Sequence, residues 1–436
     1  MKRYGWLLGC CLFLSIGMLW AADEPDLRML QQKAAQSRDM EGYVGVCKYL
    51  YQTEENPELL LLYADSIHQL ATKSKKPEQL VEYYIWASEG NFIKGDFQQG
   101  YALKRKAIAL AEKAGLKFAI SQSCCDMGYY CNVDARYDSA RYYFRKGLEA
   151  GEDLSEAGEA CRTMLTNYAS SFLFEGKTDS ALVYTIRASE RSAADKDTAM
   201  LIENLNQLGT IYRRKKNLEN CIANFEQALH LCELRGNHNA VAFIYGNIAT
   251  AYCDWNRPVD AIPFSEKAVE YALKTGNKRR IGTCYVNLGA IQIRLVQMRA
   301  EGIATLLKAI PILEEVNDRR LLCDAYNYLV NAYRMDGNLN QAMYYLQKLD
   351  KLAHEMQTDA ERFRYYQAKA GLLQESKNYT EAIVYYRRMI DMLRSGYKDT
   401  RDYEHYKRLA DCYLAVNNSS QAYEYLTQAY ALRDSA

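Results

Sequence analysis

The fold is decided by the stretch Asn206–Ala228, which reads NQLGTIYRRKKNLENCIANFEQA. Large apolar residues recur in it at helical spacing, as at Leu208 and Ile211. Small residues stand at Gly209, twelve positions later, and seven positions after that. This arrangement predicts two amphipathic helices joined by a short polar turn, with the small residues at the places where the helices cross closely.

The middle one of these small residues returns about every forty residues along most of the chain, with steps of 40 or 41. A fixed period of this length is the signature of a repeat architecture, in which each unit is one pair of helices. We call this set the small column. Its members are Gly100, Ala140, Ala181, Cys221, Ala261, Gly302, Ala342, Ala382 and Ala422.

Two further columns, mostly of small residues, recur with the same period as the small column. The spacing before Gly302 is one residue longer than elsewhere, so one turn has gained a residue. Polar and helix-breaking residues such as Asp336-Gly337-Asn338 separate the two helices of a unit. The upstream column is Ser88, Gly128, Ala169, Gly209, Ala249, Gly289, Val330, Ala370 and Ala410, and the downstream column is Ala107, Gly147, Ala188, Ala228, Ala268, Ala309, Leu349, Met389 and Ala429.

With these columns the chain resembles the tetratricopeptide repeat. The run Asn206–Tyr212, followed by Cys221, Phe225 and Ala228, matches the Leu-Gly-x-x-Tyr…Ala…Phe…Ala pattern of that family. The family's usual Trp and closing Pro are missing, and the period exceeds the common thirty-four. The resemblance implies an all-α, right-handed solenoid of about nine or ten helix pairs over residues 81–436. Residues 23–80 are expected to hold a degenerate helical unit, with helices at 43–51 and 59–70.

The first residues are expected to lie outside the fold. Lys2 and Arg3 precede an uncharged, mostly apolar run from Trp6 to Trp20, and small residues follow just before Ala22. This pattern is typical of a cleaved secretory signal over residues 1–22, which would make the protein periplasmic or cell-envelope-associated. Two alternatives stay open, namely an uncleaved membrane anchor and a lipoprotein signal at Cys10.

Eleven of the thirteen cysteines lie beyond that signal, an odd number for an exported protein. Several fall on apolar helical stripes or in small-residue slots, as Cys131 and Cys221 do. We therefore expect buried free thiols that act as small hydrophobic groups. No Cys-x-x-Cys occurs and no histidine sits at ligand spacing from a cysteine, so no metal site is expected.

Charge and motifs exclude several functions. The 55 basic and 54 acidic residues balance, which gives no support for nucleic-acid binding or a polybasic membrane patch. Glu175-Gly176-Lys177-Thr178 lacks the earlier glycine and the strand of a phosphate-binding loop. The five histidines are scattered and form no catalytic motif. We expect neither enzymatic activity nor a cofactor.

One set of polar residues stands out from the packing pattern. Asn167, Gln207, Asn247 and Asn287 follow one another at forty residues, each two positions before the upstream column. We call this position the ladder column; other units place Asp126, Tyr328, Ala368 and Arg408 there. A row of amides resembles the asparagine ladder by which other forty-residue tetratricopeptide proteins hold an extended peptide. The alternative is that these amides bond to neighbouring helices and fix the stacking.

Arginines accompany the ladder one turn further along the same helix face. Arg213, Arg214, Arg294 and Arg334 together make a candidate basic strip for acidic or carboxylate groups, or else are ordinary surface arginines. The basic slots of the carboxylate clamp known from chaperone-binding relatives hold Asn206 and Gly246 instead, so that ligand is not expected.

The sequence therefore predicts a non-catalytic scaffold in the cell envelope that binds a protein or an extended peptide in its groove, with no nucleic acid. The ending Ala431-Leu432-Arg433-Asp434-Ser435 gives an alternative. Exported tetratricopeptide regions with a similar ending resemble sensor halves of membrane regulators of Bacteroidetes type. On that reading the chain is a sensor region. The membrane is involved only through an uncleaved N-terminus or a C-terminal span beyond this sequence.

Overall fold

Helices make up all the regular structure that the computed structural model describes, which is residues 27–435 without 54–55, 357 and 398–401. No strand occurs in these residues. Three helices come first, α1 (Leu27–Ser37), α2 (Met40–Thr53) and α3 (Pro57–Ser74). The last two cover the segments 43–51 and 59–70 that the sequence marks as amphipathic. The expected signal segment lies outside the described residues.

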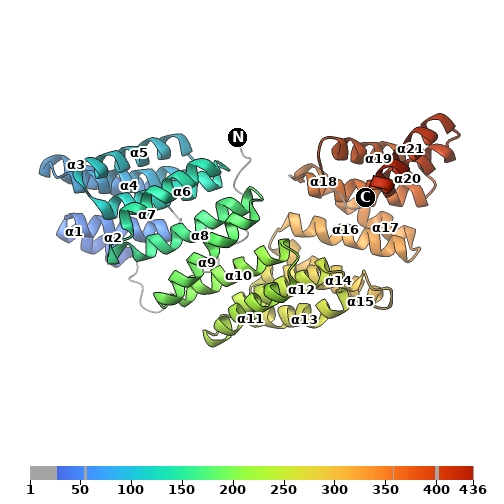
Figure 1. Ribbon diagram of the computed structural model, residues 1–436, viewed down its shortest axis with the longest axis horizontal. Helices are drawn as coiled ribbons and strands as arrows, with labels where there is room; N and C mark the ends of the chain where they lie inside the picture. The colour runs from blue at the N-terminus through green and yellow to red at the C-terminus, as the bar shows by residue number, and fades with distance from the viewer. Residues whose placement is uncertain (1–26, 54–55, 357, 398–401, 436) are drawn as a thin grey trace. The chain divides into compact units, whose positions relative to one another are not determined.

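Nine helix pairs follow, and each holds one member of the small column (Figure 1). The first helices of the pairs are α4 (Pro77–Lys94), α6 (Lys117–Val133), α8 (Gly158–Phe174), α10 (Thr198–Arg214), α12 (His238–Asp254), α14 (Lys278–Gln292), α16 (Arg319–Met335), α18 (Asp359–Glu375) and α20 (Asp402–Ala415). The second helices are α5 (Phe97–Ala114), α7 (Tyr137–Gly151), α9 (Thr178–Ala194), α11 (Leu218–Leu234), α13 (Pro258–Thr275), α15 (Arg299–Glu315), α17 (Leu339–Leu352), α19 (Tyr379–Arg394) and α21 (Ser419–Ser435). Short 3₁₀ turns are η1 (Ser155–Ala157), η2 (Val296–Met298) and η3 (Ala353–Glu355).

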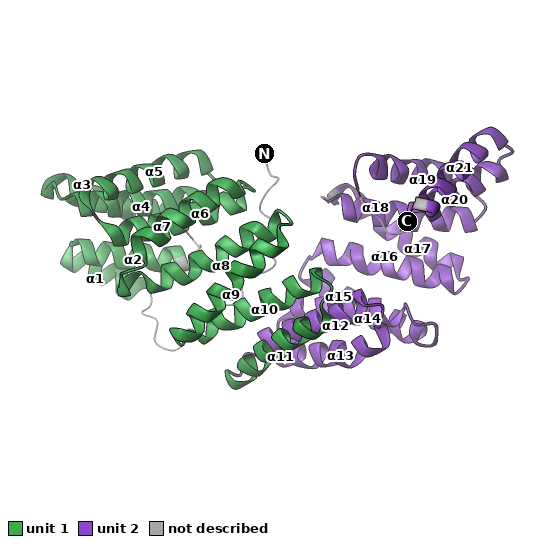
Figure 2. Cartoon of the chain, in the orientation of Figure 1, with its two compact units in different colours: residues 1–235 green, residues 236–436 purple. Residues whose placement is uncertain are grey.

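The chain divides into two compact units, residues 1–235 and 236–436, shown in different colours in Figure 2. Within each unit every helix packs against the next one in the sequence. First helices also contact the first helix of the following pair, as α6 does with α8 and α14 with α16. Each unit is therefore a stack of helix pairs with a continuous face of first helices, and the all-α tetratricopeptide-type fold is confirmed.

The small columns lie at close helix crossings, as their size predicts. Gly209 illustrates this, because a Cβ added there would lie 2.5 Å from the Phe225 ring of the same pair. Phe225 belongs to a further column, four residues after the small column, which we call the inner column. Its members are Lys104, Phe144, Thr185, Phe225, Ser265, Leu306, Leu346, Tyr386 and Leu426. The first eight are buried, so this column fills the space between the two helices of each pair.

Short turns end the helices at the expected places. Gly337 has a φ of 74°, a left-handed conformation that glycine adopts without strain, and it ends α16. Asn338 then caps α17 by accepting a hydrogen bond from the Gln341 amide. The residue gained before Gly302 is accommodated by η2, which precedes α15.

The cysteines behave as small hydrophobic residues with one exception. In the described part of the chain eleven cysteines are free; ten of them are buried and Cys253 on α12 is half-buried. Burial raises the pKa of the Cys232 thiol to about 12, so such a group stays protonated and unreactive.

Candidate functional site

The ladder column lies on the first helix of each pair, but its members are not equally accessible. Gln207 is buried, with 5% of its surface exposed. Asn167 and Asn247 are half-buried, and Asn287 is exposed. An amide that holds a peptide in the groove must be accessible, and Gln207 is not. Its neighbours give the physical reason.

Both ends of the Gln207 amide form hydrogen bonds within the first unit. Its Oε1 accepts a hydrogen bond from Thr185 Oγ1 at 3.2 Å, and its Nε2 donates to Ser170 Oγ at 2.8 Å. Thr185 is the inner-column residue of the preceding pair, and it is completely buried. Gln207 is thus a structural amide that ties α10 to α8 and α9.

The same relation recurs at two of the other three polar inner-column residues, Lys104 and Tyr386, but not at Ser265. Lys104 forms an ion pair with Asp126, the ladder residue of the next pair, at 2.9 Å between Nζ and Oδ2. The Tyr386 hydroxyl likewise forms a hydrogen bond with Arg408, again the ladder residue of the next pair. Three of the four polar inner-column side chains therefore engage the following ladder residue, because buried polar groups need partners.

A phenylalanine in the inner column needs no hydrogen-bond partner from the ladder column. Asn167 follows Phe144 and Asn247 follows Phe225, and neither ring can accept or donate a conventional hydrogen bond. Asn287 follows Ser265 and points its amide to solvent, with no hydrogen bond to any residue that the structure describes. Asn247 does have an interaction with its surroundings. In the second unit, the accessible amides of the ladder column are therefore Asn247 and Asn287.

The four arginines of the expected basic strip all have interactions, and those of Arg214, Arg294 and Arg334 lie within their own units. Arg213 is half-buried and has an interaction partner, and Arg214 donates to the Leu173 carbonyl at 2.9 Å. Arg294 is exposed and forms a hydrogen bond with the Cys253 thiol. Arg334 forms an ion pair with Glu375 on α18. These contacts join successive pairs, so the arginines act first in stacking, as surface arginines do.

Polar side chains line the first-helix face of the second unit beside Asn287. Tyr328 on α16 lies within electrostatic reach of Arg294, Asp324 and Arg364. Asp324 pairs with Arg364 on α18 at 2.9 Å between oxygen and nitrogen. Burial raises the pKa of the Asp324 carboxyl, although the nearby arginines oppose that effect. Consecutive first helices of this face therefore offer an amide (Asn287), a phenol (Tyr328) and a guanidinium group (Arg364).

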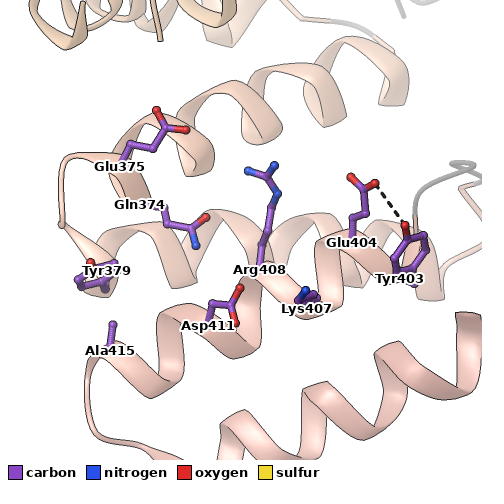
Figure 3. Close-up of a pocket in the computed structure, with 9 residues that line it drawn as sticks. All are labelled: Gln374, Glu375, Tyr379, Tyr403, Glu404, Lys407, Arg408, Asp411 and Ala415. Atoms are coloured by element: carbon purple, nitrogen blue, oxygen red, sulfur yellow. Dashed lines mark hydrogen bonds between the residues drawn. The ribbon is translucent and has the colours of Figure 1, made fainter. Parts of the chain in front are cut away.

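A pocket of about 680 Å³ opens on this face at its C-terminal end, and no sequence pattern predicted it. It lies between α18 and α20 and is lined by Gln374, Glu375, Tyr379, Tyr403, Glu404, Lys407, Arg408, Asp411 and Ala415. Figure 3 shows Arg408 extending from α20 into the pocket, with Glu404 and Asp411 on either side of it along the helix. The one available signal was Arg408 itself, a charged residue in the ladder column.

Among the described side chains no group of three or more His, Cys, Asp and Glu residues is arranged to hold a metal ion. No helix of the described chain is both long and apolar enough to cross a membrane.

Comparison with known proteins identifies the repeat. Residues 200–274 match the family model described as tetratricopeptide repeat. No curated protein matches the sequence. A signal transduction ATPase with a tetratricopeptide repeat sensor from Pyrococcus horikoshii is similar in structure, with a TM-score of 0.54 and 17% identity over 86% of this chain. The match spans 52% of that protein, so this chain corresponds to about half of its length.

Two further structures are similar at lower scores. The quorum sensor NprR from B. thuringiensis has a TM-score of 0.49 and 16% identity over 74% of this chain and 92% of its own. Aspartyl phosphate phosphatase F from Bacillus subtilis has a TM-score of 0.49 and 16% identity, over 76% and 88%. Likenesses this weak carry no argument about function.

None of these comparisons bears on the resemblance to Bacteroidetes-type regulators, which stays a prediction. The family model covers the stretch from which the forty-residue pattern was read, and the Pyrococcus likeness extends the same fold over most of the chain. Residues 200–274 are therefore identified as tetratricopeptide repeat, and the described chain has an all-α fold of that type.

Proposed function

We propose that the chain is a non-catalytic scaffold that binds a polypeptide in extended conformation along the first-helix face of its second unit. The observation that carries the proposal is the exposed Asn287 amide, which has no hydrogen bond within the described residues. An amide side chain offers a donor and an acceptor together, and the backbone of an extended peptide offers the same pair in return. Asn247 stands at the equivalent place one pair earlier.

The chain supplies a matched pair of positions for testing this proposal. Short peptides are selected from a random displayed library on the chain made from Ala22 onward, and their affinities are measured by calorimetry. Asn287→Ala should weaken binding roughly two- to tenfold, as expected for one lost hydrogen bond. Asn340→Ala removes an exposed amide from α17, a second helix, and should leave the affinity unchanged.

Cys253 provides an independent readout on the same face. It is the one half-buried thiol among the described cysteines, and it contacts Arg294 in the turn that follows the next first helix, α14. A bound peptide should therefore slow its alkylation by a maleimide. Selected peptides that neither protect Cys253 nor respond to Asn287→Ala would place binding elsewhere and refute the proposal.

We also propose that the protein is exported to the periplasm or cell envelope. The support is the N-terminal sequence, with Lys2 and Arg3 before an apolar run and small residues ahead of Ala22. Mass spectrometry of protein made in a Gram-negative host should find an N-terminus near Ala22. An intact chain in the membrane fraction would establish an anchor, and palmitate on Cys10 would establish a lipoprotein.

A further inference from the structure

The pocket between α18 and α20 combines charges of both signs on one helix face. Glu404, Arg408, Asp411 and Ala415 recur at steps of four, three and four, so they form one stripe along α20. In a helix that faced a packed core such a stripe would be apolar. The charged stripe borders a cavity whose volume of about 680 Å³ is in the range of ligand sites.

Several of the lining groups are already used within the protein. Glu375 is neutralised by Arg334, and Gln374 Oε1 accepts a hydrogen bond from the Tyr386 hydroxyl at 2.8 Å. Arg408 is bonded to the same hydroxyl. A guanidinium carries five N–H donors, so Arg408 keeps donors for a second partner.

The remaining charged groups have no ion pair within the described chain. Lys407 and Asp411 stand four residues apart on α20, a spacing at which opposite charges often pair, yet neither makes an ion pair with a described residue. Glu404 accepts only a long hydrogen bond from Tyr403, at 3.5 Å. The pocket therefore presents cationic donors, Lys407 and Arg408, next to the carboxylates Glu404 and Asp411.

We infer that this pocket is the specificity-determining part of the groove, and that it takes a piece of polypeptide carrying a carboxylate and a cationic group close together. The ligand's carboxylate would meet Lys407 and Arg408, and its ammonium or guanidinium would meet Asp411 and Glu404. The inference rests on the proposed function. The paired charges come either from neighbouring acidic and basic side chains or from the two termini of a very short peptide, and both present the same groups.

A purely anionic ligand fits the pocket less well. Lys407 and Arg408 would attract it, but Glu404 and Asp411 stand beside them on the same face and would repel it. A purely cationic ligand meets the reverse problem. Only a ligand with both signs satisfies all four side chains, and charge-assisted hydrogen bonds are the strongest that such a site forms.

The test uses the chain from Ala22 onward and fluorescent Gly-Ser peptides of equal length with blocked termini. One carries an adjacent Asp-Lys pair, one carries Asp alone, one Lys alone and one neither, and an unlabelled Gly-Gly dipeptide with free termini competes. The Asp-Lys peptide should bind at least about tenfold more tightly than each of the others. Competition by the dipeptide would assign the site to peptide termini, and its absence would assign it to side chains.

Charge reversal then locates the binding. Asp411→Lys makes the pocket predominantly cationic, so it should weaken the Asp-Lys peptide about tenfold and strengthen the Asp-only peptide. Asp391→Lys makes the same change on the exposed surface of α19, outside the pocket, and should alter neither affinity.

Two results would overturn the inference. In one, all charged peptides bind alike or none binds. In the other, inorganic phosphate or the Asp-only peptide binds the parent chain as tightly as the Asp-Lys peptide does. Library-selected peptides that lose affinity with Asn287→Ala but not with Asp411→Lys would leave the scaffold proposal standing and remove only the pocket inference.

Discussion

Lys104 offers the sharpest test of how the pairs are held together. Its side chain is completely buried in the inner column, where Phe144 and Phe225 stand in other pairs. It forms ion pairs with Glu89 and Asp126, and Glu89 also accepts a hydrogen bond from Tyr130 at 2.7 Å. Burial alone would lower the pKa of Lys104, but the two carboxylates more than offset it and the pKa lies above its usual value.

Lys104→Met keeps the volume of the side chain and removes its charge. Glu89, with 3% of its side chain exposed, is then left as a buried carboxylate without a counter-ion, while Asp126 is 21% exposed and still reaches water. Breaking a buried pair in this way costs about 3–5 kcal/mol of unfolding free energy. Adding Glu89→Gln removes the stranded charge and should bring the chain back to within about 2 kcal/mol of the parent.

Urea unfolding followed by circular dichroism at a helix band measures these differences. Lys106→Met is the matched control, because Lys106 is exposed and lies over the Tyr84 ring at 5.9 Å; its loss should cost less than about 1 kcal/mol. A Lys104→Met chain as stable as the parent would refute the reasoning. So would a double variant whose loss equals the sum of the two single losses, since the buried charge would then not be the cause.

Three other substitutions test the packing and the buried polar groups. Ala261→Leu overpacks a helix crossing and should cost about 1–3 kcal/mol in a thermal melt. Gln207→Ala removes the buried hydrogen bonds to Thr185 and Ser170 and should cost about 1–3 kcal/mol, whereas Asn287→Ala should change stability by less than about 0.5 kcal/mol. Burial, reinforced by the charge of Asp197, raises the pKa of Glu203 to about 8. The unfolded carboxyl ionises near pH 4.3, so stability falls as the pH rises from there to about 8. The stability of Glu203→Gln relative to the parent should therefore be a few kcal/mol higher at pH 8 than at pH 5. A difference between variant and parent that is the same at both pH values would contradict the assignment.

The sequence predicted the helix pairs because each small residue obeys a rule that is local to its own pair. Gly209 is small since Phe225, sixteen residues later, fills the same crossing. The role of a ladder residue was not predictable in this way. Gln207 is structural because of Thr185, and Arg408 is engaged because of Tyr386, so each role depends on a residue of the preceding pair. The ladder column therefore contains both of the alternatives that the sequence left open, a structural amide at Gln207 and an accessible amide at Asn287.

The pocket was even less predictable from the sequence than the roles of the ladder residues. Its lining comes from α18, α19 and α20, and one lining residue, Glu375, is paired with Arg334 of α16. The forty-residue period does not reveal such contacts between side chains of different helices. By their pattern alone, the charged residues of α20, including Lys407 and Asp411, are those of an ordinary solvated helix face.

Some ladder residues bond to the inner-column residue of the preceding pair, and this makes the repeats non-interchangeable. Removing residues 158–197, one period of α8 and α9, would keep the forty-residue rhythm and bring α10 directly after α7. Gln207 would then meet the Phe144 ring in place of the Thr185 hydroxyl, and its buried amide would lose a partner. Neighbouring pairs are thus matched by contacts between particular side chains, so the order of the pairs matters as well as their spacing.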